Sequence, residues 1–135
     1  MYTTVLTYGT FDLFHYGHSN VLKNASKLGS RLIVGVSSDQ FNKAKGKQAY
    51  EPLATRLNNV SKLHFVTKAI VEDSWEQKIN DIKRYNVSTF VIGDDWTGKF
   101  DFLKTYCDVL YLPRTPEISS TILREQLLTN TALAS

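Results

Sequence analysis

The sequence predicts a single α/β domain of the doubly wound type, in which helices cover both faces of a five-stranded parallel sheet. Two observations favour this class. Short runs of β-branched and aromatic residues alternate along the chain with stretches in which apolar residues recur at helical spacing. The strand-like runs are apolar almost throughout, which is typical of parallel strands that are buried on both faces. The length of 135 residues is enough for one domain with its own hydrophobic core.

Five runs have the length and composition expected of strands. Each is rich in Val, Ile, Leu, Thr or aromatic residues, and none contains a proline. They span Thr3–Tyr8, Arg31–Ser37, His64–Val71, Thr89–Ile92 and Val109–Leu112.

Four stretches between or after these strands show helical periodicity. A glycine ends the first of them and a proline precedes the second, as expected at helix boundaries. The patterns consist of Val21, Leu22, Ala25 and Leu28 before Gly29, of Leu53, Leu57 and Val60 after Pro52, of Trp75, Ile79, Ile82 and Tyr85, and of the residues from about Ser119 to Leu128.

No linker, repeat or low-complexity tract divides the chain, so we expect one domain over residues 1–128 and a disordered tail over 129–135. No apolar run approaches the roughly 20 residues that a membrane span needs. The first residues also lack the features of a signal peptide. Cys107 is the single cysteine, which excludes an internal disulfide, and we expect it to be a small buried hydrophobic residue. These features predict a cytoplasmic protein that does not associate with membranes.

The chain carries 16 Lys and Arg residues against 13 Asp and Glu, a formal net charge of +3. Nucleic-acid-binding domains usually present a denser basic face, so we expect no nucleic-acid partner. Lys43, Lys45 and Lys47 cluster within one short segment, which suits a small anionic ligand such as a nucleotide or a sugar phosphate. A solvated basic loop explains these three lysines equally well.

Ligands of doubly wound sheets bind beyond the carboxyl ends of the strands, where the strand order reverses. The first such segment here is Gly9–His18, in which Gly9 allows a close turn and the helix opens at Gly17. The free N–H groups of a helix N-terminus favour an anion, and His15 and His18 place two hydrogen-bond donors beside it. Metal ligation by the two histidines is a weaker interpretation, because no cysteine joins them and the nearest carboxylate is Asp12. A purely structural histidine pair is the other alternative.

Two further segments follow the fourth and fifth predicted strands. Gly93–Trp96 contains two aspartates, and Arg114–Thr121 ends in three consecutive hydroxyl residues that open the last helix. These hydroxyl groups and the forked guanidinium of Arg114 form a second candidate anion cradle. Ordinary helix capping by Ser or Thr explains the hydroxyl residues without any ligand. Two such helix N-termini on neighbouring strands indicate a polyphosphate bound between them.

These segments resemble the glycerol-3-phosphate cytidylyltransferases, a family within the HxGH nucleotidyltransferase superfamily that also holds choline- and ethanolamine-phosphate cytidylyltransferases. The HxGH and Arg-Thr…Ser-Ser-Thr motifs are highly specific as a pair, and the resemblance extends to about Leu128. The Gly-Asp-Asp-Trp and Trp-Glu-Gln-Lys stretches indicate the glycerol-phosphate branch rather than the choline branch. The matching segments are Tyr8–His18, Ser38–Asn42 with Lys45 and Lys47, Trp75–Lys78, Gly93–Leu103 and Tyr111–Thr121.

The resemblance implies a Rossmann-like domain and an enzyme that makes CDP-glycerol and pyrophosphate from CTP and sn-glycerol 3-phosphate, for teichoic-acid or capsule-type polymers. It also implies Mg²⁺ carried by CTP, no metal site made by the protein alone, and a homodimer. By this resemblance, catalysis falls to His15, His18, Lys45 and Arg114, and substrate binding to Gly9, Thr10, Phe11, Asp12, Asp39, Lys47, Arg56, Trp75, Asp95, Thr115, Ile118, Ser119, Ser120 and Thr121.

The match to the family is weakest in the middle of the chain. His64 stands where the family carries Arg or Lys, and Thr67 stands where it carries an acidic residue. Such a change is compatible with weaker acceptor binding, with a different acceptor, or with simple repacking. Two alternatives to the implied function therefore stay open: a cytidylyltransferase for another phosphoalcohol, and a non-catalytic relative that binds CTP.

Overall fold

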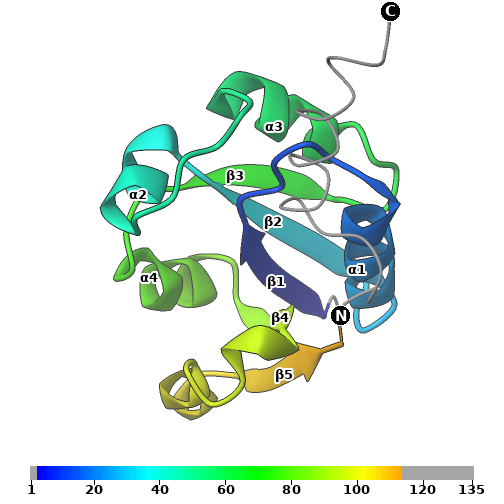
Figure 1. Cartoon of the computed structure of the whole chain (residues 1–135). Coiled ribbons are helices and arrows are strands. Elements are labelled where there is room, and N and C mark those ends of the chain that lie inside the picture. Colours follow the sequence, from blue (N-terminus) through cyan, green and yellow to red (C-terminus); the bar gives the residue numbers. More distant parts are fainter. Residues whose placement is uncertain (1–2, 114–135) are drawn as a thin grey trace, which may run out of the picture.

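A computed structural model of the chain describes residues 3–113 and shows one five-stranded sheet in which all neighbouring strands are parallel. The strand order is β3-β2-β1-β4-β5 (Figure 1). This confirms the predicted class, a doubly wound α/β domain with five parallel strands. The strands are β1 (Thr4–Gly9), β2 (Arg31–Ser37), β3 (Lys68–Glu72), β4 (Val87–Gly93) and β5 (Asp108–Leu112).

Helices connect these strands within the described part of the chain. Three of them, α1, α3 and α4, occupy stretches in which the sequence shows helical periodicity. The helix expected at 119–128 and the tail expected at 129–135 lie outside the described residues. The elements are α1 (Tyr16–Ser26), α2 (Asp39–Ala44), α3 (Leu53–Ser61), α4 (Gln77–Arg84) and the 3₁₀ helices η1 (Asp94–Trp96) and η2 (Asp101–Thr105).

The sheet is buried on both faces, as the apolar strands predict. Side chains of β1 alternate between the faces, since successive residues of a strand point to opposite sides. Val5 belongs to a core cluster with Leu22 of α1 and Val60 of α3. Leu6 belongs to a second cluster with Ile82 of α4 and Leu103 of η2. Helices α1 and α3 therefore cover one face, and α4 and η2 cover the other.

The third strand is shorter than the predicted span His64–Val71. It begins only at Lys68, and the residues before it form turns. Thr67 meets β2 through a backbone N–H to the Leu32 carbonyl at 2.8 Å and a side-chain oxygen that accepts from the Leu32 N–H at 3.0 Å. Val66 is buried in the core although it lies in irregular backbone directly after a turn. A run of apolar residues can thus be buried without strand geometry, which is why the pattern overestimates the strand.

The short elements α2, η1 and η2 are absent from the sequence prediction. Helix α2 has six residues, which is too short to show an apolar period. Its N-cap is Ser38, whose side-chain oxygen accepts a hydrogen bond from the Phe41 N–H at 3.0 Å. A capping serine is a local signal that periodicity does not detect.

The strand order reverses between β1 and β4. From β1 the chain adds β2 and β3 on one side, and then returns to add β4 and β5 on the other (Figure 1). Ligands of such sheets bind beyond the carboxyl ends of the strands that flank the reversal. The loop after β1 and the turn after β4 therefore mark the candidate site.

Candidate functional site

The loop between β1 and α1 has an unusual backbone. Phe11 and Leu13 have φ angles of 53° and 49°, in the left-handed region that side chains rarely occupy. The ring of Phe11 lies over Gly9 so closely that a Cβ there would be 2.8 Å from two ring carbons. Gly9 is therefore needed for close approach, and the strained backbone must be held by its surroundings.

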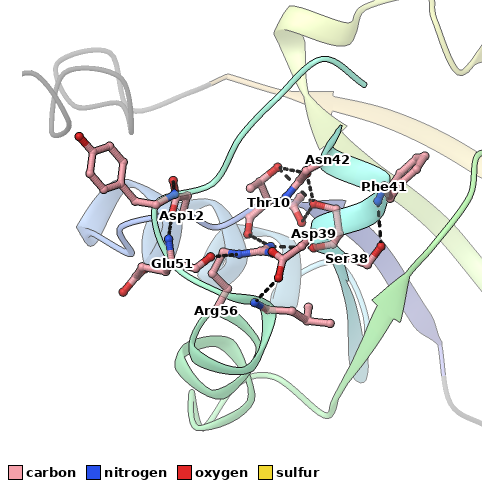
Figure 2. A network of polar contacts seen from close by, with 12 residues as sticks. Thr10, Asp12, Ser38, Asp39, Phe41, Asn42, Glu51 and Arg56 are labelled. Atoms are coloured by element: carbon pink, nitrogen blue, oxygen red, sulfur yellow. Dashed lines mark hydrogen bonds and ion pairs between the residues drawn. The ribbon is translucent and has the colours of Figure 1, made fainter. Parts of the chain in front are cut away.

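Asp12 links this loop to the segment before α3. Its carboxylate is 1% exposed and accepts hydrogen bonds from the backbone N–H of Tyr50 at 2.8 Å and of Glu51 at 3.0 Å (Figure 2). In return the N–H of Leu13 donates to the Glu51 carboxylate at 2.8 Å. The segment before α3 and the loop after β1 are thus bound to each other from both sides.

His15 is the N-cap of α1. Its Nδ1 accepts a hydrogen bond from the Gly17 N–H at 3.0 Å, and His18 Nδ1 faces the His15 N–H at 3.4 Å, which completes a capping box. The two imidazole rings are stacked, with centroids 4.0 Å apart and planes at 23°. An Nδ1 that accepts a hydrogen bond carries no proton, so the proton of the neutral ring is on Nε2. The local fold therefore fixes the tautomer of His15.

The Nε2 atom of His15 is buried and has no hydrogen-bond partner among residues 3–113. Burial also lowers the pKa of His15 below its ordinary value of 6.5, which keeps the ring neutral. An unpaired buried N–H is costly, and in native proteins it usually has a functional explanation. Here a fixed donor lies next to the point where the strand order reverses.

Basic and aromatic side chains form the next part of the site. Lys45 Nζ lies 4.4 Å from the centroid of the Phe41 ring and 5.8 Å from that of Trp75. Lys47 Nζ lies 5.8 Å from the centroid of the Trp96 ring. Burial lowers the pKa of Lys45 below its ordinary value. These lysines are thus placed over aromatic rings rather than dispersed in solvent.

Four rings form a continuous group that we call the aromatic wall: Phe41, Trp75, Trp96 and Phe100. Neighbouring ring centroids are 5.1 Å apart for Phe41 and Trp75, 6.2 Å for Trp75 and Trp96, and 5.4 Å for Trp96 and Phe100. The wall joins α2, the segment before α4 and the segment after β4. Three segments that carry the family resemblance therefore meet in space.

A buried ion pair lies behind the wall. Lys78 Nζ is 2.5 Å from Glu72 Oε2, and the two side chains are 2% and 3% exposed. Burial raises the pKa of Glu72, and the charge of Lys78 opposes that shift. Neither residue was predicted from the sequence to have a role in the site. Lys78 and Ile82 are four residues apart on α4 and share one helix face, which was the signal that Lys78 points inward.

A second buried polar group adjoins this pair. The Tyr8 hydroxyl donates to Asp81 Oδ2 at 2.6 Å, and Gln77 Nε2 donates to the same oxygen at 3.0 Å. Burial and the neighbouring carboxylate raise the pKa of Tyr8, so it stays protonated as a donor. Helix α4 is thereby attached to the carboxyl end of β1.

Arg56 is fully buried, at 0% exposure, and its guanidinium makes hydrogen bonds and an ion pair within the protein (Figure 2). It donates to the carbonyl oxygens of Glu51 at 2.9 Å, Thr10 at 3.1 Å and Ser37 at 2.7 Å. Its fourth contact is an ion pair of 2.5 Å with Asp39. One side chain thus fixes the ends of β1 and β2 and the start of α2. In this structure Arg56 and Asp39 position the site.

Thr10 belongs to a small hydroxyl and amide cluster beside that arginine. The hydroxyls of Ser37 and Thr10 lie 2.7 Å and 3.2 Å from Asn42 Oδ1, to which they donate (Figure 2). Asn42 Nδ2 is buried and has no partner in the part of the chain that the structure describes. Ser37 and Asn42 were not among the sequence-predicted site residues, because single polar residues at the end of a strand and in a short helix carry no distinctive spacing.

The structure brings most of the predicted site residues to the carboxyl end of the sheet. Asp95 is exposed in η1, directly after β4. His64 is exposed and precedes β3, so it lies toward the amino end of the strands, away from the loop after β1. The predicted residues Arg114, Thr115, Ile118, Ser119, Ser120 and Thr121 lie outside the described residues.

Among residues 3–113, no group of three or more His, Cys, Asp or Glu side chains lies close enough together to hold a metal ion. No helix within the same residues has both the length and the apolar character needed to span a membrane.

Comparisons with known proteins agree with this geometry. The family model "Cytidylyltransferase-like" matches residues 6–126. The glycerol-3-phosphate cytidylyltransferase of Bacillus spizizenii is 52% identical over 123 residues, covering 91% of this chain and 95% of the relative. The corresponding enzyme of Staphylococcus aureus is 44% identical, covering 91% and 93%.

A solved structure extends the comparison to the fold. The lipopolysaccharide core biosynthesis protein of Thermoplasma volcanium superposes with a TM-score of 0.71 at 23% identity, covering 84% of this chain and 98% of that protein. At that identity the likeness concerns the fold alone. The family is established by the model match and by the sequence relatives, which agree with the site at the end of β1. The chain therefore belongs to the glycerol-3-phosphate cytidylyltransferase family within the cytidylyltransferase-like proteins.

Proposed function

We propose that this chain is an active glycerol-3-phosphate cytidylyltransferase, which makes CDP-glycerol and pyrophosphate from CTP and sn-glycerol 3-phosphate. The family membership supports the reaction. The observation that carries the proposal to this chain is the buried, unpartnered Nε2–H of His15 at the reversal of strand order. A fixed donor at that point supports catalysis, because it can stabilise the negative charge that builds on a phosphate oxygen during the transfer.

The reaction needs positioning and charge stabilisation more than proton transfer. A phosphate oxygen of glycerol 3-phosphate forms a bond to the α-phosphorus of CTP, while the bond from that phosphorus to the bridging oxygen of the β-phosphate breaks. The attacking phosphate is already anionic at neutral pH, so no strong general base is required. His15 Nε2–H, with His18 stacked on it, donates a hydrogen bond to phosphate oxygens as negative charge builds on them.

Cations beside the aromatic wall neutralise the remaining charge. Lys45 lies at the edge of the wall and is assigned to substrate phosphate oxygens. Burial makes the charged form of Lys45 less favourable, as its lowered pKa shows. A phosphate bound beside Lys45 would favour the charged form again, because opposite charges attract. Arg114 and the hydroxyl residues Ser119–Thr121 are assigned to the triphosphate on the resemblance alone.

Mg²⁺ is assigned to CTP rather than to the protein. His15 Nε2 and Lys45 Nζ are nitrogen donors, which suit phosphate oxygens and not a hard cation. The carboxylate of Asp12 is close in sequence but accepts two backbone hydrogen bonds. Mg²⁺ bound to the triphosphate would neutralise charge on the leaving pyrophosphate.

The cellular setting is a proposal of the same kind. CDP-glycerol is an activated unit, and the resemblance assigns it to teichoic-acid or capsule-type polymers made from cytoplasmic precursors. A homodimer is expected from the family. Tyr16, at 53% exposure, is the aromatic residue near the HxGH segment that is available for such an interface, since Phe11 belongs to the core.

The decisive assay is pyrophosphate release by the purified chain with CTP and Mg²⁺. The acceptors are glycerol 3-phosphate, ribitol 5-phosphate, ethanolamine phosphate and choline phosphate. We expect glycerol 3-phosphate to give the highest kcat/KM, with CTP preferred over UTP and ATP by at least about tenfold, because a pocket built for one base leaves polar groups unpaired with another. No release with any acceptor would sink the proposal in favour of a CTP-binding relative.

A further inference from the structure

We propose that Lys78 is a built-in cation that fills an ammonium-binding cage, and that it thereby makes the site reject phosphoalcohols whose alcohol part carries an ammonium group. The cage itself is argued from the structure. The step to acceptor choice rests on the proposed function.

The Nζ atom of Lys78 is surrounded by aromatic rings. It lies 4.6 Å from the ring centroid of Tyr8, 4.8 Å from that of Trp75, 5.3 Å from that of Phe100 and 5.9 Å from that of Phe41. Cations within about 6 Å of a ring centroid are attracted by the ring, and cages of several rings are how proteins recognise alkylammonium ligands. Four rings around one ammonium group match that chemistry.

A carboxylate completes the cage. Glu72 Oε2 lies 2.5 Å from Lys78 Nζ, and both side chains are almost fully buried. An anion beside an aromatic cage strengthens the binding of a positive ligand and excludes a negative one. Every feature of an ammonium site is therefore present, and the side chain of α4 takes the place of the ligand.

The cage lies next to the candidate acceptor site. Phe41 and Trp75, which contact Lys78, are also the two rings beneath Lys45, to which we assign substrate phosphate. Trp75 is 45% exposed, so the cage reaches the surface there. An acceptor whose phosphate meets Lys45 would extend its alcohol part along the wall. A neutral glycerol is tolerated there, whereas an ammonium group would meet the charge of Lys78 and find its cage occupied.

A purely structural ion pair is the competing explanation, and it differs in one measurable respect. In a structural pair the two opposite charges only have to neutralise each other. Replacing both partners of such a buried pair by apolar residues is often neutral for stability. Removing the lysine of a purely structural pair would leave acceptor choice unchanged, whereas removing it from a cage beside the acceptor would favour ammonium-bearing acceptors. The variant Lys78→Ala separates the two explanations by its acceptor preference, because it leaves both the cage and Glu72 in place.

The first experiment measures the thermal unfolding of Lys78→Ala in increasing methylammonium chloride, against sodium chloride of equal ionic strength. We expect a rise in Tm that saturates with methylammonium and is absent from the parent protein. If Lys78→Ala is unfolded in buffer, the same titration is followed as recovery of the folded signal. The double variant Glu72→Gln, Lys78→Ala lacks the carboxylate and should show no such rise. A response of Lys78→Ala equal to that in sodium chloride overturns the cage.

The second experiment compares kcat/KM for ethanolamine phosphate with that for glycerol 3-phosphate. The ratio should rise at least about tenfold in Lys78→Ala, equivalent to about 1.4 kcal/mol. The matched control is Lys83→Ala, which removes an exposed lysine of the same helix whose Nζ lies 5.5 Å from the Tyr106 ring, and it should leave the ratio unchanged. An unchanged ratio in Lys78→Ala overturns the selection role. A parent protein without glycerol 3-phosphate activity instead overturns the proposed function. In that case the methylammonium titration still tests whether the cage binds an ammonium group.

Discussion

At the scale of single residues, the two ring nitrogens of His15 have separate functions, one in capping α1 and one as a hydrogen-bond donor. Nδ1 accepts the Gly17 N–H and begins α1, whereas Nε2 carries the proton that has no partner among residues 3–113. Substitutions at this position can therefore be chosen to remove one function and keep the other.

Replacing His15 by Ala should remove both functions, whereas replacing it by Asn should keep the cap through Oδ1 and remove the donor at the position of Nε2, which the shorter amide does not reach. Asn is a favoured N-cap residue, so His15→Asn should keep the stability of the parent, whereas His15→Ala should lose about 1 kcal/mol. Both variants should lose on the order of 10²–10³ in kcat, with little change in CTP affinity. Urea unfolding, steady-state kinetics and CTP titration check these outcomes. Equal losses in kcat and in CTP binding would mean that His15 only binds substrate.

The lowered pKa of His15 gives a pH dependence of defined sign. The unfolded chain takes up a proton at this residue near pH 6.5, while the folded protein does so only at lower pH. The stability contributed by neutral His15 is therefore complete above pH 6.5 and is lost as the pH falls through the folded pKa. Activity should fall over the same range, because a protonated Nδ1 cannot accept the Gly17 N–H. NMR titration of the ring, with the denatured chain as reference, should give a midpoint below 6.5, and a midpoint at or above it would contradict the burial argument.

At the scale of elements, the candidate site is a set of loops joined to one another by buried charged side chains. Arg56 of α3 holds the ends of β1 and β2, and Asp12 holds the segment before α3. The positive φ angles of Phe11 and Leu13 are energetically unfavourable. They are maintained because side chains from other elements hold the loop in this conformation.

Replacing Arg56 by Met should destabilise the fold strongly. Three backbone carbonyls would lose their donor inside the protein, and each unsatisfied buried group costs roughly 1–3 kcal/mol. We expect a loss of at least about 2 kcal/mol in urea unfolding, together with a loss of activity. Asp39→Asn is the matched control, because that carboxylate is 58% exposed and the amide still offers an oxygen to the guanidinium, so we expect a smaller loss than in Arg56→Met. Comparable losses in both variants would mean that the ion pair, and not the carbonyl contacts, holds the loops.

The element scale also shows what the sequence can and cannot predict. Strand β2 was predicted to the residue, because an apolar run buried on both faces is a strong signal. The burial of Arg56 was not predicted, because arginines are mostly exposed. Its burial depends on three carbonyl oxygens from separate segments, and the sequence does not show that these segments meet. The Lys78–Glu72 pair was missed for the same reason. Periodicity reports which face of a helix is buried, and does not report that a charged residue on that face has a partner.

At the scale of the whole molecule, the site lies at the end of the best-buried part of the sheet. Strand β1 is central, and all but the last of its residues are buried, whereas the edge strands β3 and β5 are only half-buried over most of their length. The HxGH loop thus extends from a rigid strand, which holds its donors in place.

Hydrogen exchange should reflect this arrangement. Backbone amides of β1 and β2 should exchange only through global unfolding, while those of β5 should exchange through smaller openings and at least about tenfold faster. Mass-spectrometric exchange on peptides from residues 4–9 and 108–112 measures the difference. Equal protection in the two peptides would show that the described part of the sheet opens only as one unit.

The aromatic wall has a spectroscopic consequence. Trp75 and Trp96 are the only tryptophans in the chain, and their rings are in contact within the wall. All indole fluorescence of this protein therefore originates beside Lys45, Lys47 and Lys78. Nearby ammonium groups shift indole emission, and a phosphate that draws a lysine away changes that shift. Occupancy of the site can thus be followed through intrinsic emission, with no label and no substituted residue.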